Sequence, residues 1–275
     1  MDISLQVSAA GPTVTGAVLR SDQAYHELLC EKTTLDWGIA FVNARFAGIP
    51  AGNQFREVWV EDQAEVRAAL DAVGAHFRDQ QRACTRWVLA EAQNPEAVDG
   101  VLTEAGYRRV DRLAMALSAW PTVQASDAVR VLPARPMRGA FAAILEDAVA
   151  DWPGGLRDDW VQAGLDRLDD HRMDMFVGLI DKKPAGACGL FQVGDIGRVV
   201  DPHVCSAFRR RGVATSMMLA AVGLARRLQM RIVCTDVSVD NHAGKALLSH
   251  LGFIEGGRIV EYVAPDAPAT VDGYR

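Results

Sequence analysis

The sequence has few cysteines and no pattern that would make them a disulfide or zinc framework. The five cysteines of the 275-residue chain are scattered, odd in number and include no Cys-x-x-Cys pair. We therefore expect a reduced, intracellular protein, and the histidines, which lack metal-ligand spacing, predict no metal. No secretory leader pattern opens the chain, and the longest apolar run, Met217–Ala225, is too short to cross a bilayer. These absences predict a cytoplasmic protein without a membrane partner.

A surplus of basic residues is also missing. The chain holds 29 Lys and Arg against 35 Asp and Glu, a net charge of -6. A nucleic-acid-binding protein would present a basic field, so we expect no nucleic acid partner. The GxxxxGK[ST] nucleotide loop and the HExxH zinc motif are absent as well. What is present is an ordinary share of hydrophobic residues, 49%, which is enough for one or two cores.

The C-terminal half alternates between strand and helix patterns. Their order, β-α-α-β-β-β-α-β-α-β, predicts an α/β (α+β) fold with a mixed sheet flanked by helices. A hairpin turn is expected at Asp181–Pro184. The predicted strands are Val129–Leu132, Met173–Ile180, Ala185–Val193, Ile196–Cys205, Arg231–Val237 and Arg258–Val263, and the predicted helices are Pro136–Asp151, Leu156–Asp170, Arg211–Met230 and Asn241–Leu251.

The N-terminal half carries a weaker copy of this pattern. Leu102-x3-Gly106-Tyr107 matches Leu248-x3-Gly252-Phe253, 146 residues later. At the same offset, Val58-Trp59-Val60 matches Val204-Cys205-Ser206, and a long helix follows both. A break around Trp120-Pro121 separates the halves. We therefore interpret the chain as two tandem related domains, residues 1–122 and 127–265, with a C-terminal tail at 266–275.

The segment from Val204 to Thr215 carries the clearest chemical signal. It joins a predicted strand to a predicted helix and contains three consecutive arginines, Arg209–Arg211. The small residues Gly212 and Ala214 let a ligand approach the backbone closely. The first N–H groups of a helix are unpaired and favour phosphate, and Thr215 adds a hydroxyl. The pattern predicts polyphosphate binding; a plain helix start with solvated arginines is the alternative.

This loop resembles the acyl-CoA pyrophosphate loop of the GNAT superfamily of N-acetyltransferases. Arg209-x-x-Gly212-x-Ala214 follows a strand, and Asn241 and Leu251-Gly252-Phe253 come after it in the order and spacing typical of that family. The resemblance covers roughly residues 127–263. It implies an acetyl-CoA-dependent N-acetyltransferase that transfers an acetyl group to a small primary amine directly in a ternary complex, as a monomer or a homodimer.

The resemblance also implies which residues hold acetyl-CoA, the co-substrate. The pantetheine arm would run along the end of the strand and contact Asn241, and the pyrophosphate would lie on the loop. Lys245 could reach a coenzyme phosphate, although a solvated lysine is an equally good interpretation. The implied set is Val204, Cys205, Ser206, Arg209, Arg210, Arg211, Gly212, Val213, Ala214, Thr215, Asn241 and Lys245.

Two positions depart from the family pattern. Ser206 stands where a proline is usual, and Leu248 stands where a tyrosine often protonates the leaving thiolate. A leucine has no proton to donate, so Ser249 or water serves instead, or the thiolate leaves unassisted. The departure at Leu248 keeps open an alternative function, a catalytically silent acyl-CoA-binding or regulatory protein.

Acetyl transfer to an amine requires a base, because only the neutral amine is nucleophilic. Asp201 is the first candidate, and His203 and Asp236 are alternatives. Strand alternation places Asp201 and His203 on one face unless Pro202 distorts the strand.

The predicted helices before and after Pro153 point to the acceptor. Residues 146–170 hold eight acidic residues together with Trp152 and Trp160. Carboxylates and aromatic rings suit a cationic amine, so Asp151, Trp152 and Asp236 are candidate substrate-binding residues. A solvated acidic helix face explains the same pattern.

The N-terminal copy lacks the loop. Gln63–Ala68 stands at the matching position without a glycine, and Glu61 and Asp62 precede it. Because carboxylates repel pyrophosphate, we expect this half to be a degenerate GNAT-like domain that binds no coenzyme.

Overall fold

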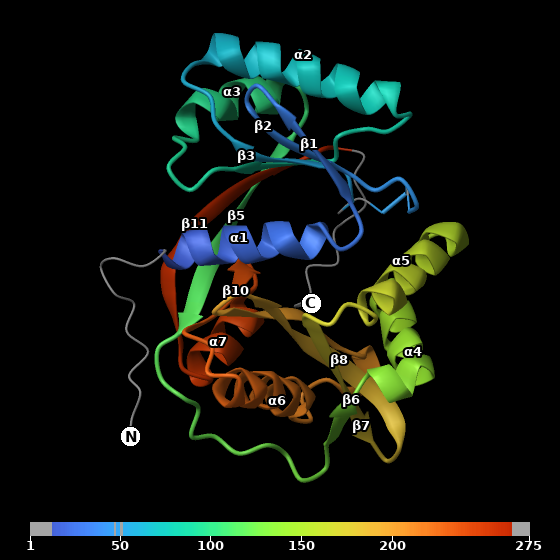
Figure 1. Ribbon diagram of the computed structural model, residues 1–275. Coiled ribbons are helices and arrows are strands. Elements are labelled where there is room, and N and C mark those ends of the chain that lie inside the picture. The colour runs from blue at the N-terminus through green and yellow to red at the C-terminus, as the bar shows by residue number, and fades with distance from the viewer. Residues whose placement is uncertain (1–12, 47, 50–51, 266–275) are drawn as a thin grey trace. The chain divides into compact units, whose positions relative to one another are not determined.

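The computed structural model describes residues 13–46, 48–49 and 52–265, and it divides the chain into two compact units (Figure 1). The first unit contains residues 13–22 and Leu113–Gly257, and the second contains Gln23–Arg112 and residues 258–265. This division differs from a single cut near Trp120-Pro121, because strands β5 (Arg108–Leu117) and β11 (Phe253–Val263) each contribute to both units. The expected tail at 266–275 lies outside the described residues.

The first unit is built on a mixed sheet in the order β11-β5-β10-β9-β8-β7-β6. Neighbouring strands from β6 to β9 are antiparallel, whereas β9 and β10 are parallel. This arrangement confirms the predicted fold class. The strand bounds are β6 Arg130–Pro133, β7 Met173–Ile180, β8 Lys183–Val193, β9 Ile196–Val204 and β10 Ile232–Ser238.

Helices cover both faces of this sheet (Figure 1). On one face, a Cβ atom at Gly186 would lie 2.8 Å from the methyl carbon of Met217, so α6 packs closely only because glycine stands there. Met173 and Met175 point to the other face, toward α4 and α5. The helices of this unit are α1 Val14–His26, whose last residues belong to the second unit, α4 Arg138–Ala148, α5 Gly154–Arg167, α6 Val213–Arg227 and α7 His242–His250.

Two local predictions can be compared directly with the backbone. Asp181 and Lys182 have φ values of 50° and 63°, which confirms the tight hairpin between β7 and β8. The predicted start of the last strand at Arg258 is wrong, because β11 begins at Phe253. Two glycines, Gly256 and Gly257, lie in the additional stretch of strand, and a Cβ atom at Gly256 would overlap Val14 of α1.

The second unit repeats the strand pattern of the first. Its sheet has the order β1-β2-β3-β4-β11, with antiparallel neighbours from β1 to β3 and a parallel β3–β4 pair. In both units the first strand of the parallel pair carries a bulge, β3 against β4 at Glu57 (φ 51°) and β9 against β8 at Asp201 (φ 47°). This shared irregularity supports the duplication. The bounds are β1 Glu31–Leu35, β2 Gly38–Val42, β3 Gln54–Val58, β4 Arg86–Leu89, α2 Gln63–Asp79 and α3 Glu96–Glu104.

A buried ion cluster attaches α1 to the sheet of the first unit. The guanidinium of Arg198 on β9 lies 2.6 Å from carboxylate oxygens of both Asp22 on α1 and Asp236 on β10. It also donates a hydrogen bond to the carbonyl of Val18, at 3.2 Å. The side chains of Arg198 and Asp236 are only 10% and 8% exposed, so their charges depend on each other for stabilisation.

We expect Arg198→Met to destabilise the protein strongly, by about 3–5 kcal/mol, because it leaves buried carboxylates without their cation. Arg231→Met is the matched control: it breaks an ion pair with Asp195 whose side chains are 45% and 48% exposed. That loss should stay below about 1 kcal/mol. Urea unfolding measures both changes, and similar losses for the two variants would contradict the prediction.

Candidate active site

Strands β9 and β10 separate toward their C-terminal ends. They pair from Ile196 and Ile232 to Arg198 and Cys234, and no further pair joins them in the part of the chain that the structure describes. Beyond Arg198, β9 carries the bulge at Asp201, which shifts its register against β8. The C-terminal part of β9 therefore has one edge that no longer pairs with β10.

The loop after β9 ends in an open helix N-terminus. Gly212 adopts a left-handed conformation (φ 79°) at the start of α6, and no side chain caps the helix. Among the described residues, no acceptor takes the amide protons of Val213, Ala214 or Thr215. A Cβ atom at Gly212 would lie 2.9 Å from Cβ of Ser126, so glycine is required by both conformation and space. The amides and the positive end of the helix dipole make this an anion site.

A cavity of about 420 Å³ lies against this N-terminus. Most of the residues predicted to hold the coenzyme line it, whereas Cys205, Ser206, Arg211 and Lys245 do not. The lining consists of Pro202, Val204, Arg209, Arg210, Gly212, Val213, Ala214, Thr215, Asn241, Ala243, Gly244 and Leu247.

Three of the predicted coenzyme contacts have partners within the chain. Asn241 caps α7, and its Oδ1 accepts a hydrogen bond from the amide of Gly244 at 2.8 Å. Lys245 donates from Nζ to the carbonyl of Val239 at 2.5 Å. The guanidinium of Arg211 lies over the ring of Phe208, 5.7 Å from its centre.

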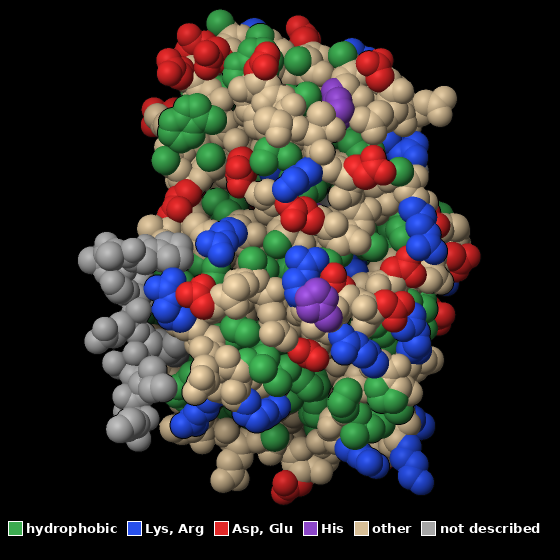
Figure 2. Space-filling view, in the orientation of Figure 1, with side chains coloured by type: hydrophobic (Ala, Val, Ile, Leu, Met, Phe, Trp, Pro, Cys, Tyr) green, Lys and Arg blue, Asp and Glu red, His purple; other side chains and the backbone are tan. Residues whose placement is uncertain are grey.

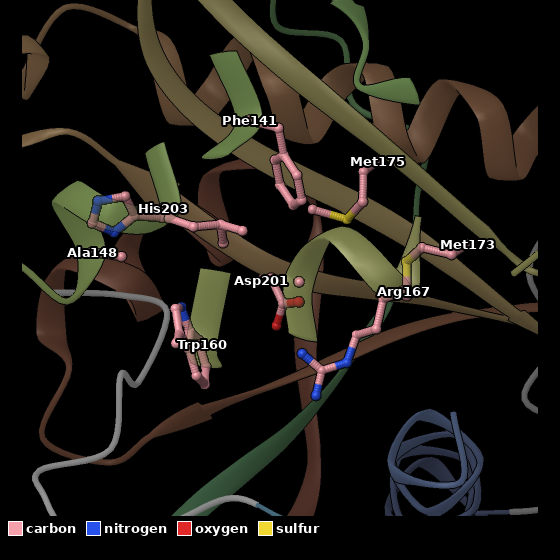
Figure 3. Close-up of a pocket in the computed structure, with 10 residues that line it drawn as sticks. Phe141, Ala148, Trp160, Arg167, Met173, Met175, Asp201 and His203 are labelled. Carbon is pink, nitrogen blue, oxygen red and sulfur yellow. The ribbon is translucent and has the colours of Figure 1, made fainter. Parts of the chain in front are cut away.

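A second, smaller pocket of about 30 Å³ lies on the side of β9 that faces α4 and α5 (Figure 3). Asp201 and His203 both line it, so the alternation expected along the strand holds despite the bulge. Figure 3 shows the Asp201 carboxylate and the side chains of Trp160 and Arg167 around one space. The other lining residues, mostly apolar, are Phe141, Leu145, Ala148, Gly164, Met173 and Met175.

His203 is paired with a residue that the sequence analysis did not single out. Its Nε2 lies 3.0 Å from Oδ2 of Asp147, near the end of α4. Because a carboxylate only accepts hydrogen bonds, Nε2 carries the proton and Nδ1 is the basic nitrogen. Burial lowers the pKa of His203, and the Asp147 carboxylate opposes that effect. At neutral pH the imidazole is therefore uncharged and able to accept a proton.

Asp147 belongs to the acidic helical segment of the sequence, but nothing in the spacing pairs it with His203, 56 residues away. The sequence showed only that this segment is rich in carboxylates. The packing of α4 against the sheet brings Asp147, among these carboxylates, to His203.

Other predicted site residues lie elsewhere in the first unit. Asp236 belongs to the ion cluster with Arg198, and Ser249 is exposed on α7. Trp152 packs against Trp160 with ring centres 5.5 Å apart, and Asp151 is exposed. None of the four lines either pocket. Leu248 is fully buried in the core.

The corresponding helix N-terminus of the second unit has its own acceptors. The Asp62 side chain accepts from the amide of Glu65 at 2.9 Å, and Glu65 accepts in turn from the amide of Glu61 at 2.7 Å. The Asp62 cap satisfies the third amide of α2, which corresponds to the open amide of Thr215 in α6, and both bonds place carboxylates at this helix end.

Two findings bear on other partners. No helix among the described residues is long and apolar enough to cross a membrane. On the face shown in Figure 2, Lys and Arg side chains are interspersed with Asp and Glu and form no basic field.

Comparisons with solved structures agree with this fold. A conserved protein of unknown function from Staphylococcus epidermidis superposes with a TM-score of 0.71 at 12% identity, covering 86% of this chain and 94% of that one. A GCN5-related N-acetyltransferase from Kribbella flavida gives a TM-score of 0.64 at 15% identity, covering 94% and 97%. A tandem GNAT protein from the clavulanic acid biosynthesis pathway gives 0.53 at 17% identity, covering 85% and 80%.

These likenesses show the fold. Residues 141–253 also match the acetyltransferase (GNAT) family at the level of sequence. The chain therefore contains a GNAT acetyltransferase domain, as the loop and the Leu251-Gly252-Phe253 ending predicted. A comparison with curated proteins found no significant match.

We expect His203 to titrate below the ordinary histidine range, and Asp147→Asn to lower its pKa further. The reason is that the Asp147 carboxylate stabilises the protonated ring by a hydrogen bond and by its charge. Asp195→Asn removes a carboxylate in the turn before β9 and is the control. Histidine ring resonances followed by NMR against pH measure the shift; a His203 pKa that rises in Asp147→Asn would refute the assignment.

Proposed function

We propose that the first unit is an acetyl-CoA-dependent N-acetyltransferase that transfers an acetyl group directly to a small primary amine in a ternary complex. The observation that carries this proposal is the placement of two pockets on opposite sides of one strand. Pro202 and Val204 line the pocket at the open helix N-terminus, whereas Asp201 and His203 line the pocket beside α4 and α5. A coenzyme and an acceptor can thus approach the end of β9 from its two sides.

The larger pocket suits the coenzyme. The amides of Val213, Ala214 and Thr215 would hold the pyrophosphate, with Arg209 and Arg210 supplying positive charge. The unpaired edge of β9 near Val204 offers backbone groups to the amides of the pantetheine arm. The second unit presents carboxylates at the matching place, and on this proposal it binds no coenzyme.

The smaller pocket suits the acceptor. The exposed carboxylate of Asp201 attracts a cationic amine, and neighbouring apolar side chains hold its carbon skeleton. His203, held by Asp147, takes the ammonium proton at Nδ1. The nitrogen then forms a bond to the acetyl carbon while the thioester C–S bond breaks, and the nitrogen releases its surplus proton to solvent. The departing thiolate takes its proton from solvent, because Leu248 has none to give.

A catalytically silent acyl-CoA-binding protein is the second candidate, and Leu248 favours it. This side chain is fully buried, and Ser249 lies outside both pockets, so neither position provides an acid to the thiolate. The two candidates make the same prediction for coenzyme binding and opposite predictions for turnover.

An amine panel separates them. The full-length protein is incubated with acetyl-CoA and primary amines that are cationic, neutral or anionic beyond the reacting nitrogen, and release of free CoA thiol is measured. If the protein is an enzyme, the release of CoA thiol will depend on the amine. Binding of acetyl-CoA by calorimetry without turnover of any amine would favour the silent protein, and absence of binding would reject both.

Gly212→Asp should abolish acetyl-CoA binding, with an affinity loss of at least about 100-fold. The new side chain meets Ser126 and places a negative charge against the pyrophosphate. Gly223→Asp adds the same charge to the same helix at a roomier position, where a Cβ atom would lie 3.8 Å from the nearest side-chain atom, on Arg227, and it should bind normally. Calorimetric titration compares the two variants; retained affinity in Gly212→Asp would mean that the loop does not bind the coenzyme.

His203→Gln should reduce kcat/KM by roughly 10²- to 10⁴-fold, the usual contribution of a positioned base. Asp147→Asn should be active, and the acidic limb of its pH–activity profile should move to lower pH, because the pKa of His203 falls. Asp201→Asn should raise KM for a cationic amine and leave that limb in place. If the limb instead disappears in Asp201→Asn and persists in His203→Gln, the base is Asp201.

A further inference from the structure

Three side chains with metal-ligand chemistry meet beside the end of β9. They are Asp147 on α4, His203 on β9 and Cys205 directly after that strand. A carboxylate oxygen, a ring nitrogen and the sulfur atom lie within 4.8 Å of one another. One of these contacts, between His203 Nε2 and Asp147 Oδ2, is 3.0 Å long.

This spacing is close to that of a zinc site. Zn²⁺ bonds of about 2.0–2.3 Å in a tetrahedral arrangement place ligand atoms roughly 3.3–3.8 Å apart. His203 and Cys205 are separated by one residue, so they leave the chain on the same side. The set of one nitrogen, one sulfur and one oxygen suits Zn²⁺, whereas Mg²⁺ and Ca²⁺ prefer oxygen ligands alone.

Surrounding contacts hold the three groups in place. The amide of Ser206 donates to Oδ2 of Asp147 at 3.3 Å, and the amide of Cys205 donates to the carbonyl of Ala185 at 2.9 Å. Such outer contacts orient the ligands of protein metal sites. The Asp147 side chain is 32% exposed and that of His203 14%, so an ion can reach the cluster from solvent.

We propose that Asp147, His203 and Cys205 form a binding site for Zn²⁺, with three protein ligands and a water molecule in the fourth position. On binding, the Cys205 thiol releases its proton to solvent and the thiolate bonds to the ion, while the proton on His203 Nε2 moves to Nδ1 and Nε2 bonds to the ion. Sequence spacing alone predicts no metal here, because His203-x-Cys205 is a short motif and the third ligand comes from another element.

Occupation of this site stops acetyl transfer, because His203 cannot hold the metal and accept the ammonium proton at once. This consequence rests on the proposed function, whereas metal binding itself does not. Zinc is thus an inhibitor that competes with the base, and it acts without occupying the helix N-terminus that suits the coenzyme.

Cobalt provides the direct test. The full-length protein, reduced with a phosphine and stripped with a chelator, is titrated with Co²⁺ and its absorption spectrum is recorded. We expect one equivalent to produce a thiolate-to-cobalt charge-transfer band and the intense visible bands of a tetrahedral site, and one equivalent of Zn²⁺ to remove both. A spectrum of hexaaqua cobalt throughout the titration would overturn the proposal.

Variants identify the ligands. Cys205→Ser should lose the charge-transfer band, and Asp147→Asn should weaken Co²⁺ binding at least about tenfold. Cys30→Ser is the matched control, because Cys30 is a partly exposed thiol of the second unit, and its spectrum should equal that of the unchanged protein. Circular dichroism checks that each variant is folded. A band that persists in Cys205→Ser, or vanishes in Cys30→Ser, would refute the assigned site.

Inhibition is measured separately as the ratio of CoA release with and without Zn²⁺. We expect a loss of at least about tenfold in the unchanged protein, reversed by chelator, and a ratio near one in Asp147→Asn at the same free Zn²⁺ concentration. If the cobalt spectrum appears but no amine is acetylated, the proposed function is wrong and the metal site is supported. If an amine is acetylated but no cobalt spectrum appears, the metal site is wrong and the proposed function is supported.

Discussion

The bulge at Asp201 is the constraint on which the rest of the candidate site depends. It places a non-glycine residue in a left-handed conformation inside β9, beyond the last pairing with β10 at Arg198. After this point Pro202 and Val204 face the pocket at the helix N-terminus, and Asp201 and His203 face the pocket beside α4 and α5. A regular parallel pairing would close the edge of β9 and leave no common boundary between the two pockets. The strain of the bulge is thus coupled to the arrangement of the site.

The last strands of the two halves of the sequence are exchanged between the two compact units. β11, the last strand of the C-terminal half, pairs with β4, and β5, the last strand of the N-terminal half, lies beside β10. Each compact unit is therefore completed by a strand from the other half of the sequence. Arg198 adds α1 to the first unit through its buried ion cluster. A fragment that began at residue 127 would lack β5, α1 and the carboxylate of Asp22.

The N-termini of α2 and α6, which follow the two bulged strands, differ in the charge of the residues around them. At α2 the carboxylate of Asp62 caps the amide of Glu65 and the Glu65 carboxylate lies beside it, whereas α6 follows arginines and Gly212 and has no side-chain cap. A carboxylate has a different role at the end of β9, where Asp147 orients His203. Asp147 and His203 have a role in each of the two proposals. In the first they accept the proton of the substrate, and in the second they bind a metal ion together with Cys205. The two roles exclude each other, which gives the site a chemical means of regulation.

The sequence by itself determined the order of elements in the C-terminal half, the loop and its Gly212, the turn at Asp181 and the presence of the family. These features rest on periodicity and backbone conformation, which act over a few residues. Only the tertiary structure decided four other features. They are the pairing of His203 with Asp147, the approach of Cys205 to that pair, the burial of Asp236 against Arg198, and the contribution of β5 and β11 to both units. Each of them joins residues far apart in the chain, and only the packing of helices and strands against one another selects such partners from many chemically equivalent ones.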